Sequence, residues 1–251
     1  MSTTSDSNNN PDKATLVFCH GLAGFSHIGP IYYFRGIPKL LARLDMDGRF
    51  PQTPPGDTIA QRAAVLAKFI EEIGTDVHLI GHSMGGLDAR FVAANLDPQR
   101  RVRSVTTIAT PHRGSSLVDW LLHTNGLFQR GMRLWLKDAV ADLTPEAMAE
   151  FNLQIADRED VHYRSWAARR PFHESAFLLR HWTRLMRKNE GDNDSQVSVN
   201  SAKWGDFQGT LRADHFELIG WNIGLPLACF ERPFNHLGFY EELCKTLMKK
   251  D

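Results

Sequence analysis

The sequence predicts a single α/β domain with a mainly parallel central sheet and helices on both of its faces. Short apolar runs typical of buried strands alternate along the chain with segments whose apolar residues recur three and four positions apart, as in helices. The 251 residues are enough for one large core, and no repeat or linker divides them. We expect the domain to span residues 14–251, after a disordered tail over 1–13 that is rich in Ser, Asn and Asp.

The apolar pattern places the elements in order. Strands are predicted at 14–19, 77–80, 102–108 and 161–166, and helices at 31–44, 58–73, 86–94, 176–186 and 234–250. Residues 117–151 are helical in pattern and rich in large apolar side chains, with Gly126 and Gly131 as interruptions. The segment 45–57 fits the fold class least well, because Pro, Gly and Asp are dense where another strand is expected.

The turn Gly81-His82-Ser83-Met84-Gly85 carries the strongest functional signal. It joins a predicted strand to a predicted helix, so a serine stands at the apex of a strand–turn–helix unit, an arrangement called a nucleophile elbow. Glycines on either side allow the two backbones to approach closely and Ser83 to adopt a strained conformation. The N-terminus of the helix favours negative charge that develops near the serine oxygen. This pattern indicates a serine hydrolase.

Composition argues against several other classes of protein. The formal net charge is zero and there is no basic stripe, so nucleic acid is not an expected partner. The chain has no clustered His/Cys pattern for a catalytic metal and no run of eighteen apolar residues for a membrane span. Three cysteines cannot all pair, which favours a reducing compartment. Because residues 1–13 also lack the pattern of a secretory leader, we expect a cytoplasmic protein, with export by a leaderless route as the alternative.

A serine hydroxyl needs a base within hydrogen-bond reach and an acid that orients this base. In enzymes with a nucleophile elbow, the order along the chain is nucleophile, acid, histidine. Asp194 is the candidate acid, Asp192 is its close competitor, and the alternative is that both are ordinary turn residues. His215 is the candidate base, and His236 is the other histidine considered after Asp194.

Ester hydrolysis also needs an oxyanion hole, a pair of donors for the charged oxygen of the intermediate. One donor is normally the backbone N–H of the residue after the nucleophile, here Met84. The second comes from a loop after an early strand, and the Leu22 N–H in His20-Gly21-Leu22 is the candidate. Alone, His20-Gly21 would be an ordinary strand-end turn, but together with the elbow it predicts an oxyanion loop.

Several segments together resemble the bacterial triacylglycerol lipases of family I. In order they are His20-Gly21-Leu22-Ala23-Gly24-Phe25, Gly81-His82-Ser83-Met84-Gly85-Gly86-Leu87, Arg90-Phe91-Val92-Ala93-Ala94, Ser104-Val105-Thr106-Thr107-Ile108, Thr110-Pro111-His112-Arg113-Gly114-Ser115, Asn193-Asp194 and Asp214-His215. The resemblance implies an α/β-hydrolase fold that acts on carboxylic esters without an organic cofactor. It also implies that Ser83, Asp194 and His215 form the catalytic triad, with Leu22 and Met84 as the oxyanion hole.

The resemblance assigns further roles around the triad. Arg62 matches an arginine that braces the oxyanion loop, and the segment 117–151 matches the lid. The candidate lid and substrate-contacting residues of this segment are Trp120, Leu121, Phe128 and Trp135. A displaced apolar lid would bring the protein into transient contact with a lipid surface, whereas the alternative is a fixed cap packed on the core.

Departures from the family pattern concern a disulfide, a metal ion and one strand. Family members often have a disulfide whose second cysteine corresponds to a position near Val199 in this chain. No cysteine is present there, so this disulfide is not expected. The family's calcium site uses an aspartate two residues after the histidine, where this chain has Glu217, and the partner acid is Glu174 only in a gapped match. A calcium ion held by these two glutamates is the alternative to a site without metal. The segment 45–57 is shorter than the family's strand.

The predicted function is hydrolysis of fatty-acid esters by a lipase or esterase, through an acyl-enzyme on Ser83. The expected partner is a small lipid or ester substrate. Alternatives within the same chemistry are a carboxylesterase for soluble esters and an esterase for polymeric hydroxyalkanoates. The alternative from another class is a non-catalytic binding protein with the same fold, because fold alone does not give function.

Overall fold

The computed structural model describes residues 14–124, 126–223 and 234–249. Its centre is a six-stranded sheet in the order β4-β1-β5-β6-β7-β8, in which each neighbouring pair is parallel. The strands are β1 Thr15–Cys19, β4 Gly48–Arg49, β5 Val77–His82, β6 Val102–Ile108, β7 His162–Ala168 and β8 Asp206–Leu211. The predicted α/β class with a mainly parallel sheet is therefore confirmed. The predicted tail over 1–13 lies outside the described residues.

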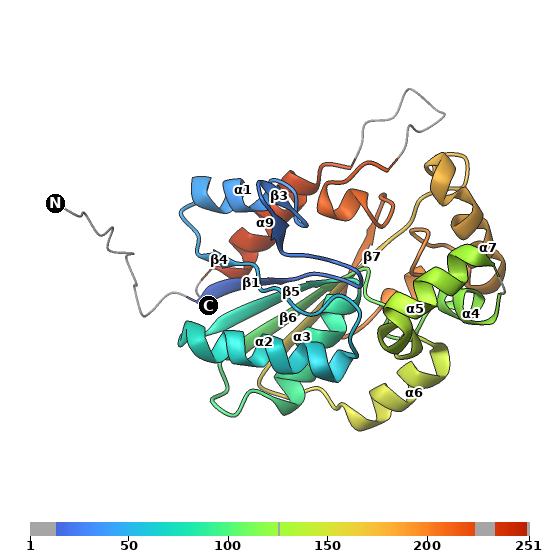
Figure 1. Cartoon of the computed structure of the whole chain (residues 1–251). Coiled ribbons are helices and arrows are strands. Elements are labelled where there is room, and N and C mark those ends of the chain that lie inside the picture. The colour runs from blue at the N-terminus through green and yellow to red at the C-terminus, as the bar shows by residue number, and fades with distance from the viewer. Residues whose placement is uncertain (1–13, 125, 224–233, 250–251) are drawn as a thin grey trace.

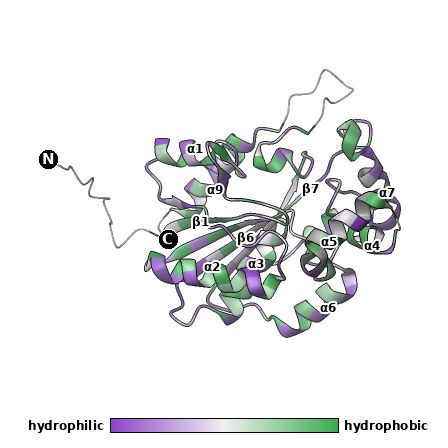
Figure 2. Ribbon diagram, in the orientation of Figure 1, coloured by the Kyte–Doolittle hydropathy of each residue, from purple (hydrophilic) through white to green (hydrophobic). Residues whose placement is uncertain are grey.

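Helices cover the sheet on two sides, as Figure 1 shows. Alternate residues of β1 face opposite layers, because successive side chains of a strand point to opposite faces. Leu16 and Phe18 pack against α1 (Ile37–Arg43) and α9 (His236–Leu247). On the other face, Val17 and Cys19 pack against α2 (Ile59–Ile73) and α3 (Met84–Asn95). In Figure 2, α2 carries both hydrophobic and hydrophilic bands, as expected for a helix with one buried side.

The first part of the helix predicted at 31–44 is wrong. Residues Ile31–Tyr32 form β3, which pairs with β2 (His27–Ile28) in a small antiparallel hairpin. The helix begins only at Ile37, because Gly36 adopts a φ of 77° and a proline follows in the first turn. The segment 45–57 contributes β4, a strand of two residues at the sheet edge. The short strand expected there is thus observed.

The segment predicted as a lid is helical, as expected, and forms α4 (Ser116–His123), α5 (Leu127–Ala141) and α6 (Pro145–Gln154). Gly126 caps the N-terminus of α5, whereas Gly131 lies within this helix rather than interrupting it. Beyond β7 come a 3-10 turn η1 (Phe177–Leu179) and α7 (Arg180–Glu190), followed later by α8 (Val199–Ala202) and the 3-10 turn η2 (Glu217–Ile219). Among the described residues, no helix is long and apolar enough to cross a membrane.

Candidate active site

Ser83 stands at the sharp turn between β5 and α3. Its backbone has a φ of 55° and a ψ of −132°, a conformation that side-chain-bearing residues rarely adopt. Two hydrogen bonds hold it: the Ser83 N–H donates to the carbonyl of Ile108 (3.0 Å), and the Thr110 hydroxyl donates to the carbonyl of Ser83 (2.8 Å). The strain predicted for a nucleophile elbow is present and is maintained by the neighbouring strand β6.

The glycines of the elbow are required by close approach. A Cβ at position 81 would lie 2.4 Å from the Gly86 backbone, and one at position 85 would lie 2.2 Å from the carbonyl oxygen of Cys19. In the loop after β1, a Cβ at Gly21 would lie 2.9 Å from the Cβ of Ser83. The loop after β1 therefore lies directly against Ser83, where an oxyanion donor is needed.

His215 and Asp194 form a short, buried side-chain contact. The distance from the His215 Nδ1 to the Asp194 Oδ2 is 2.7 Å, and the two side chains are 4% and 0% exposed. The second carboxylate oxygen accepts hydrogen bonds from the N–H groups of Gln196 (2.9 Å) and Val197 (2.7 Å). The backbones are joined as well, because the His215 N–H donates to the carbonyl of Asp194 (2.9 Å). An imidazole held in this way donates its Nδ1–H to the carboxylate and has its Nε2 available as a base.

The competing residues are engaged elsewhere. Asp192 is half-exposed and pairs with Arg169 at 2.6 Å. His236 is the first residue of α9 and contacts the carbonyl of Arg35 through its Nε2 (2.9 Å). By contrast, the ring of His215 lies 4.5 Å from the ring of His82, the residue directly before Ser83. The structure thus brings Asp194 and His215 together next to the elbow, and it does not bring Asp192 or His236 to them.

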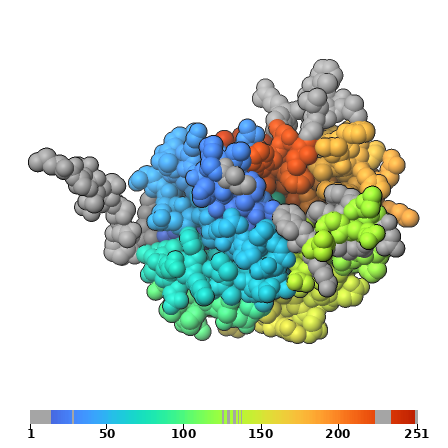
Figure 3. Space-filling view, viewed as in Figure 1, coloured from blue at the N-terminus to red at the C-terminus, as the bar shows by residue number. Residues whose placement is uncertain are grey.

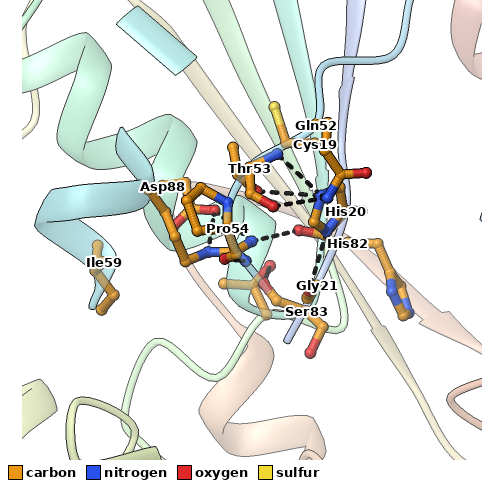
Figure 4. Close-up of polar contacts among 12 residues, drawn as sticks. Cys19, His20, Gly21, Gln52, Thr53, Pro54, Ile59, His82, Ser83 and Asp88 are labelled. Carbon is orange, nitrogen blue, oxygen red and sulfur yellow. Dashed lines mark hydrogen bonds and ion pairs between the residues drawn. The ribbon is translucent and has the colours of Figure 1, made fainter. Parts of the chain in front are cut away.

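The loop that carries Leu22 is fixed by two buried side chains (Figure 4). His20 contacts the N–H and hydroxyl of Thr53 through its Nε2 (both 3.2 Å) and the carbonyl of Gly21 through its Nδ1 (2.9 Å). Arg62, fully buried, donates to the carbonyl of His20 (2.7 Å) and pairs with Asp88 (2.7 Å). The bracing role that the resemblance implies for Arg62 agrees with these contacts.

Tyr33 contacts both the loop after β1 and the nucleophile elbow, and no sequence pattern marks it. Its hydroxyl accepts a hydrogen bond from the Gly21 N–H (3.1 Å) and lies 2.8 Å from the Nδ1 of His82. Because the hydroxyl proton is free to donate to this nitrogen, Tyr33 links the loop after β1 to the nucleophile elbow. Burial lowers the pKa of His82 well below its ordinary value, so this ring is neutral.

An apolar pocket opens beside Ser83. Its walls come from the loop after β1, from α4, α5 and α7, and from the loop that carries Asp194, and they include Leu22, Trp120, Leu121, Trp182 and Val197. Trp120 and Leu121, two of the four predicted lid residues, therefore line the pocket together with Ser83. The side chains of Phe128 and Trp135, the other two, lie outside the described part of the chain. An apolar pocket beside a serine suits an acyl chain.

A model of the alpha/beta hydrolase family matches residues 16–215. The chain belongs to this family. Among curated proteins, this hydrolase is 28% identical to Triacylglycerol lipase 2 of Saccharomyces cerevisiae, over 84% of this chain and 81% of that protein. It is also 37% identical to a triacylglycerol lipase of Pseudomonas fragi, over 42% of this chain and 37% of that protein.

Solved structures of similar fold include lipases. A lipase of Bacillus licheniformis in its mature form superposes with a TM-score of 0.70 at 24% identity, over 85% of this chain and 90% of that one. The Staphylococcus hyicus lipase superposes with a TM-score of 0.73 at 17% identity, over 98% of both chains. At these sequence identities, the structural similarity shows the fold alone. The structures confirm the predicted fold, and the curated relatives confirm the predicted class of enzyme, a lipase or esterase.

The two glutamates considered as calcium ligands face guanidinium groups. The Glu217 carboxylate pairs with Arg170 at 2.6 Å, and the Glu174 carboxylate pairs with Arg170 (3.4 Å) and Arg212 (2.6 Å). Within the part of the chain that the structure describes, no three His, Cys, Asp or Glu side chains form a group that could hold a metal ion. Calcium requires six or more oxygen ligands. Two carboxylates already neutralised by arginines do not fit such a site.

Proposed function

We propose that this hydrolase cleaves carboxylic esters of fatty acids through a triad of Ser83, His215 and Asp194. The observation that carries the proposal is the 2.7 Å contact between His215 and Asp194, buried beside the strained elbow of Ser83. Relatives named triacylglycerol lipases support esters of fatty acids as the substrate class. The apolar pocket beside Ser83 supports it independently.

In this mechanism, His215 accepts the Ser83 proton as the serine oxygen attacks the ester carbonyl. Asp194 holds the imidazole in the required tautomer and stabilises its charged form. The N–H groups of Leu22 and Met84 bind the oxyanion, and Met84 also begins α3, whose first amides have no acceptor within their own helix. The alcohol leaves with the proton from His215, and water then releases the acid from Ser83 by the same steps.

Two substitutions test the proposal with a chromogenic short-chain ester. Ser83→Ala is expected to lower kcat by about 10⁶-fold, and Asp194→Asn by about 10⁴-fold, as in other triads. Asp192→Asn is the matched control, because it removes an equal charge from the same loop without touching His215. An organophosphonate should label the wild type and not Ser83→Ala. Turnover by Ser83→Ala at the wild-type rate would refute the assignment, and an Asp192→Asn loss as large as that of Asp194→Asn would refute the chosen acid.

We further propose that the protein makes transient contact with a lipid surface next to the pocket. The pocket is lined by residues of α4, α5 and α7, and the same region exposes large apolar side chains. Leu127 and Leu134 of α5 are 88% and 89% exposed, and Phe177 and Leu178, directly before α7, are 69% and 66% exposed. Exposed apolar residues beside an apolar pocket favour binding at a lipid–water interface. In Figure 3 the surface of α4 lies beside that of the segment around α7.

We propose a reducing, cytoplasmic compartment for this hydrolase. The support is that Cys19 and Cys244 are buried thiols without a disulfide. Export by a leaderless route is the alternative. Fractionation of the native cells, with immunoblotting of the cytoplasmic and external fractions, distinguishes them; the protein in the external fraction of intact cells would overturn the proposal.

A further inference from the structure

Arg170 lies two residues after β7 and contacts both loops of the proposed acid–base pair. Its backbone N–H donates to the carbonyl of Asn193 (2.9 Å), the residue before Asp194. Its guanidinium grips Glu217, two residues after His215, with the Nε at 3.0 Å and an Nη at 2.6 Å from the two carboxylate oxygens. A planar, two-point contact of this kind fixes orientation as well as distance.

Hydrogen bonds connect the Glu217 carboxylate, directly or through Asp214, to the backbone on both sides of His215. The Glu217 carboxylate also accepts from the N–H of Asp214 (2.8 Å), and the Asp214 carboxylate accepts from the N–H groups of Phe216 and Glu217 (both 2.9 Å). His215 lies in the middle of this closed turn. The position of its ring therefore depends on where Arg170 holds Glu217.

Guanidinium groups hold both glutamates at this place. The side chains of Arg170, Glu174 and Glu217 are each about nine-tenths buried, and Arg212 pairs with Glu174 from the more exposed side. Removing one partner from such a buried pair leaves an uncompensated charge, which is strongly unfavourable.

We propose that Arg170 is a positioning residue that acts as an internal cation, joining the acid loop to the histidine loop in place of a divalent metal ion. The inference rests on the proposed function of His215 and Asp194. It predicts that ester hydrolysis depends on this guanidinium and not on calcium.

The test compares the wild type with Arg170→Met, Arg170→Lys and Glu217→Gln on a soluble ester. Arg170→Met is expected to lower kcat by about tenfold or more with KM within about twofold, because the base is misplaced while the pocket is intact. Arg170→Lys should recover part of the loss, since it restores the charge and not the planar fork. Arg169→Met is the matched control: this neighbour pairs with Asp192 at the surface, and its loss should leave kcat unchanged.

A second arm measures the melting temperature of the wild type with a chelator and with millimolar calcium chloride. No change in the melting temperature is expected in either case. This measurement detects calcium binding even when a preparation has no esterase activity. A fall with chelator that calcium reverses would overturn the proposal. So would a folded Arg170→Met enzyme with the wild-type kcat. If Arg170→Met does not fold, Glu217→Gln, which keeps the side-chain volume, must show the same selective loss of kcat, and a wild-type kcat there would equally overturn it.

Discussion

Besides His215, three buried histidines lie in the elbow or close to it. Burial lowers the pKa of His20 to about 4, with Arg62 adding to the effect, and it lowers the pKa values of His82 and His112 well below the ordinary value. Each ring is held by specific partners; His112, for example, lies between Arg90 (3.2 Å) and the hydroxyl of Thr107 (3.0 Å). All three fold as neutral rings.

Protonation of these histidines should therefore destabilise the protein as the pH falls, whereas the buried carboxyls of Asp88 and Asp214, whose pKa values burial raises to about 6, act in the opposite direction. A histidine whose folded pKa is depressed contributes stability above its unfolded pKa and loses it as the pH falls toward the folded pKa. For His20 alone, with an unfolded pKa near 6.5, the free energy of unfolding should fall by about 2 kcal/mol between pH 7 and pH 5. His82 and His112 act in the same direction. Urea unfolding at the two pH values measures the change.

Substitution of His20 isolates its share of this acid sensitivity. His20→Gln should reduce the loss between pH 7 and pH 5 by about 2 kcal/mol, whatever it does to stability at pH 7. His162→Gln, at an exposed position, is the control and should leave the loss unchanged. An unchanged pH dependence in His20→Gln would contradict the assignment.

At the residue scale, the sequence predicted the residues with a local signal and missed those defined by distant partners. Ser83 is marked by its flanking glycines, and Asp194 and His215 by chain order and family resemblance. Tyr33 has no such mark, since its partner His82 is 49 positions away along the chain. Arg170 meets Glu217 across 47 positions, and only the fold reveals that pair.

At the scale of elements, the elbow unit is built on backbone contact between β1 and α3. Gly85 lies at that contact, because any Cβ there would meet the carbonyl of Cys19 at 2.2 Å, and backbone cannot move aside easily. Gly131 in α5 is the opposite case, since a Cβ there would meet no atom of the described side chains or backbone within 4 Å. Two helical glycines of the same chain thus have opposite requirements.

Alanine at these two glycines should have opposite effects on stability. Gly85→Ala should destabilise the fold by about 3 kcal/mol or more, because it forces the strand and the helix apart. Gly131→Ala should raise the free energy of unfolding by up to about 1 kcal/mol, from helix propensity. Thermal and urea unfolding of both variants measure this. A Gly85→Ala protein as stable as Gly131→Ala would contradict the close approach.

The apolar runs predicted the core strands and most helices because burial selects both composition and period. The hairpin β2–β3 was not predicted, because each of its strands has only two residues and because it lies in an aromatic stretch that also fits a helix. Strand β8 was missed for another reason. It is an edge strand whose residues alternate between exposed and half-buried positions and include Gly209, so no apolar run marks it.

At the scale of the whole molecule, the apolar surface beside the pocket should distinguish emulsified from dissolved substrates. The double variant Phe177→Ser/Leu178→Ser should hydrolyse emulsified long-chain triglyceride at least about tenfold more slowly, because each side chain contributes roughly 1.5–3 kcal/mol when buried in an apolar phase. Its rate on a dissolved short-chain ester should not change. Rates on the two substrates, measured with one preparation, provide the comparison.

Leu153→Ser is the matched control for this surface. Leu153 is 82% exposed on α6, a helix that contributes none of the described pocket residues. Its substitution should alter neither rate. Equal losses for Leu153→Ser and the double variant on emulsion would mean that general surface hydrophobicity, and not the region beside the pocket, governs adsorption.

The strand order has a consequence for the growing polypeptide. From β1 through β5, β6, β7 and β8, each strand is added beside the one before it in the order in which it leaves the ribosome. The nucleophile arrives early, with β5, whereas the histidine follows β8, the last strand to dock. Under the proposed mechanism, a nascent chain therefore contains Ser83 well before it contains His215, the base that activates this serine. The chain becomes able to hydrolyse esters only when β8 has docked at the edge of the sheet.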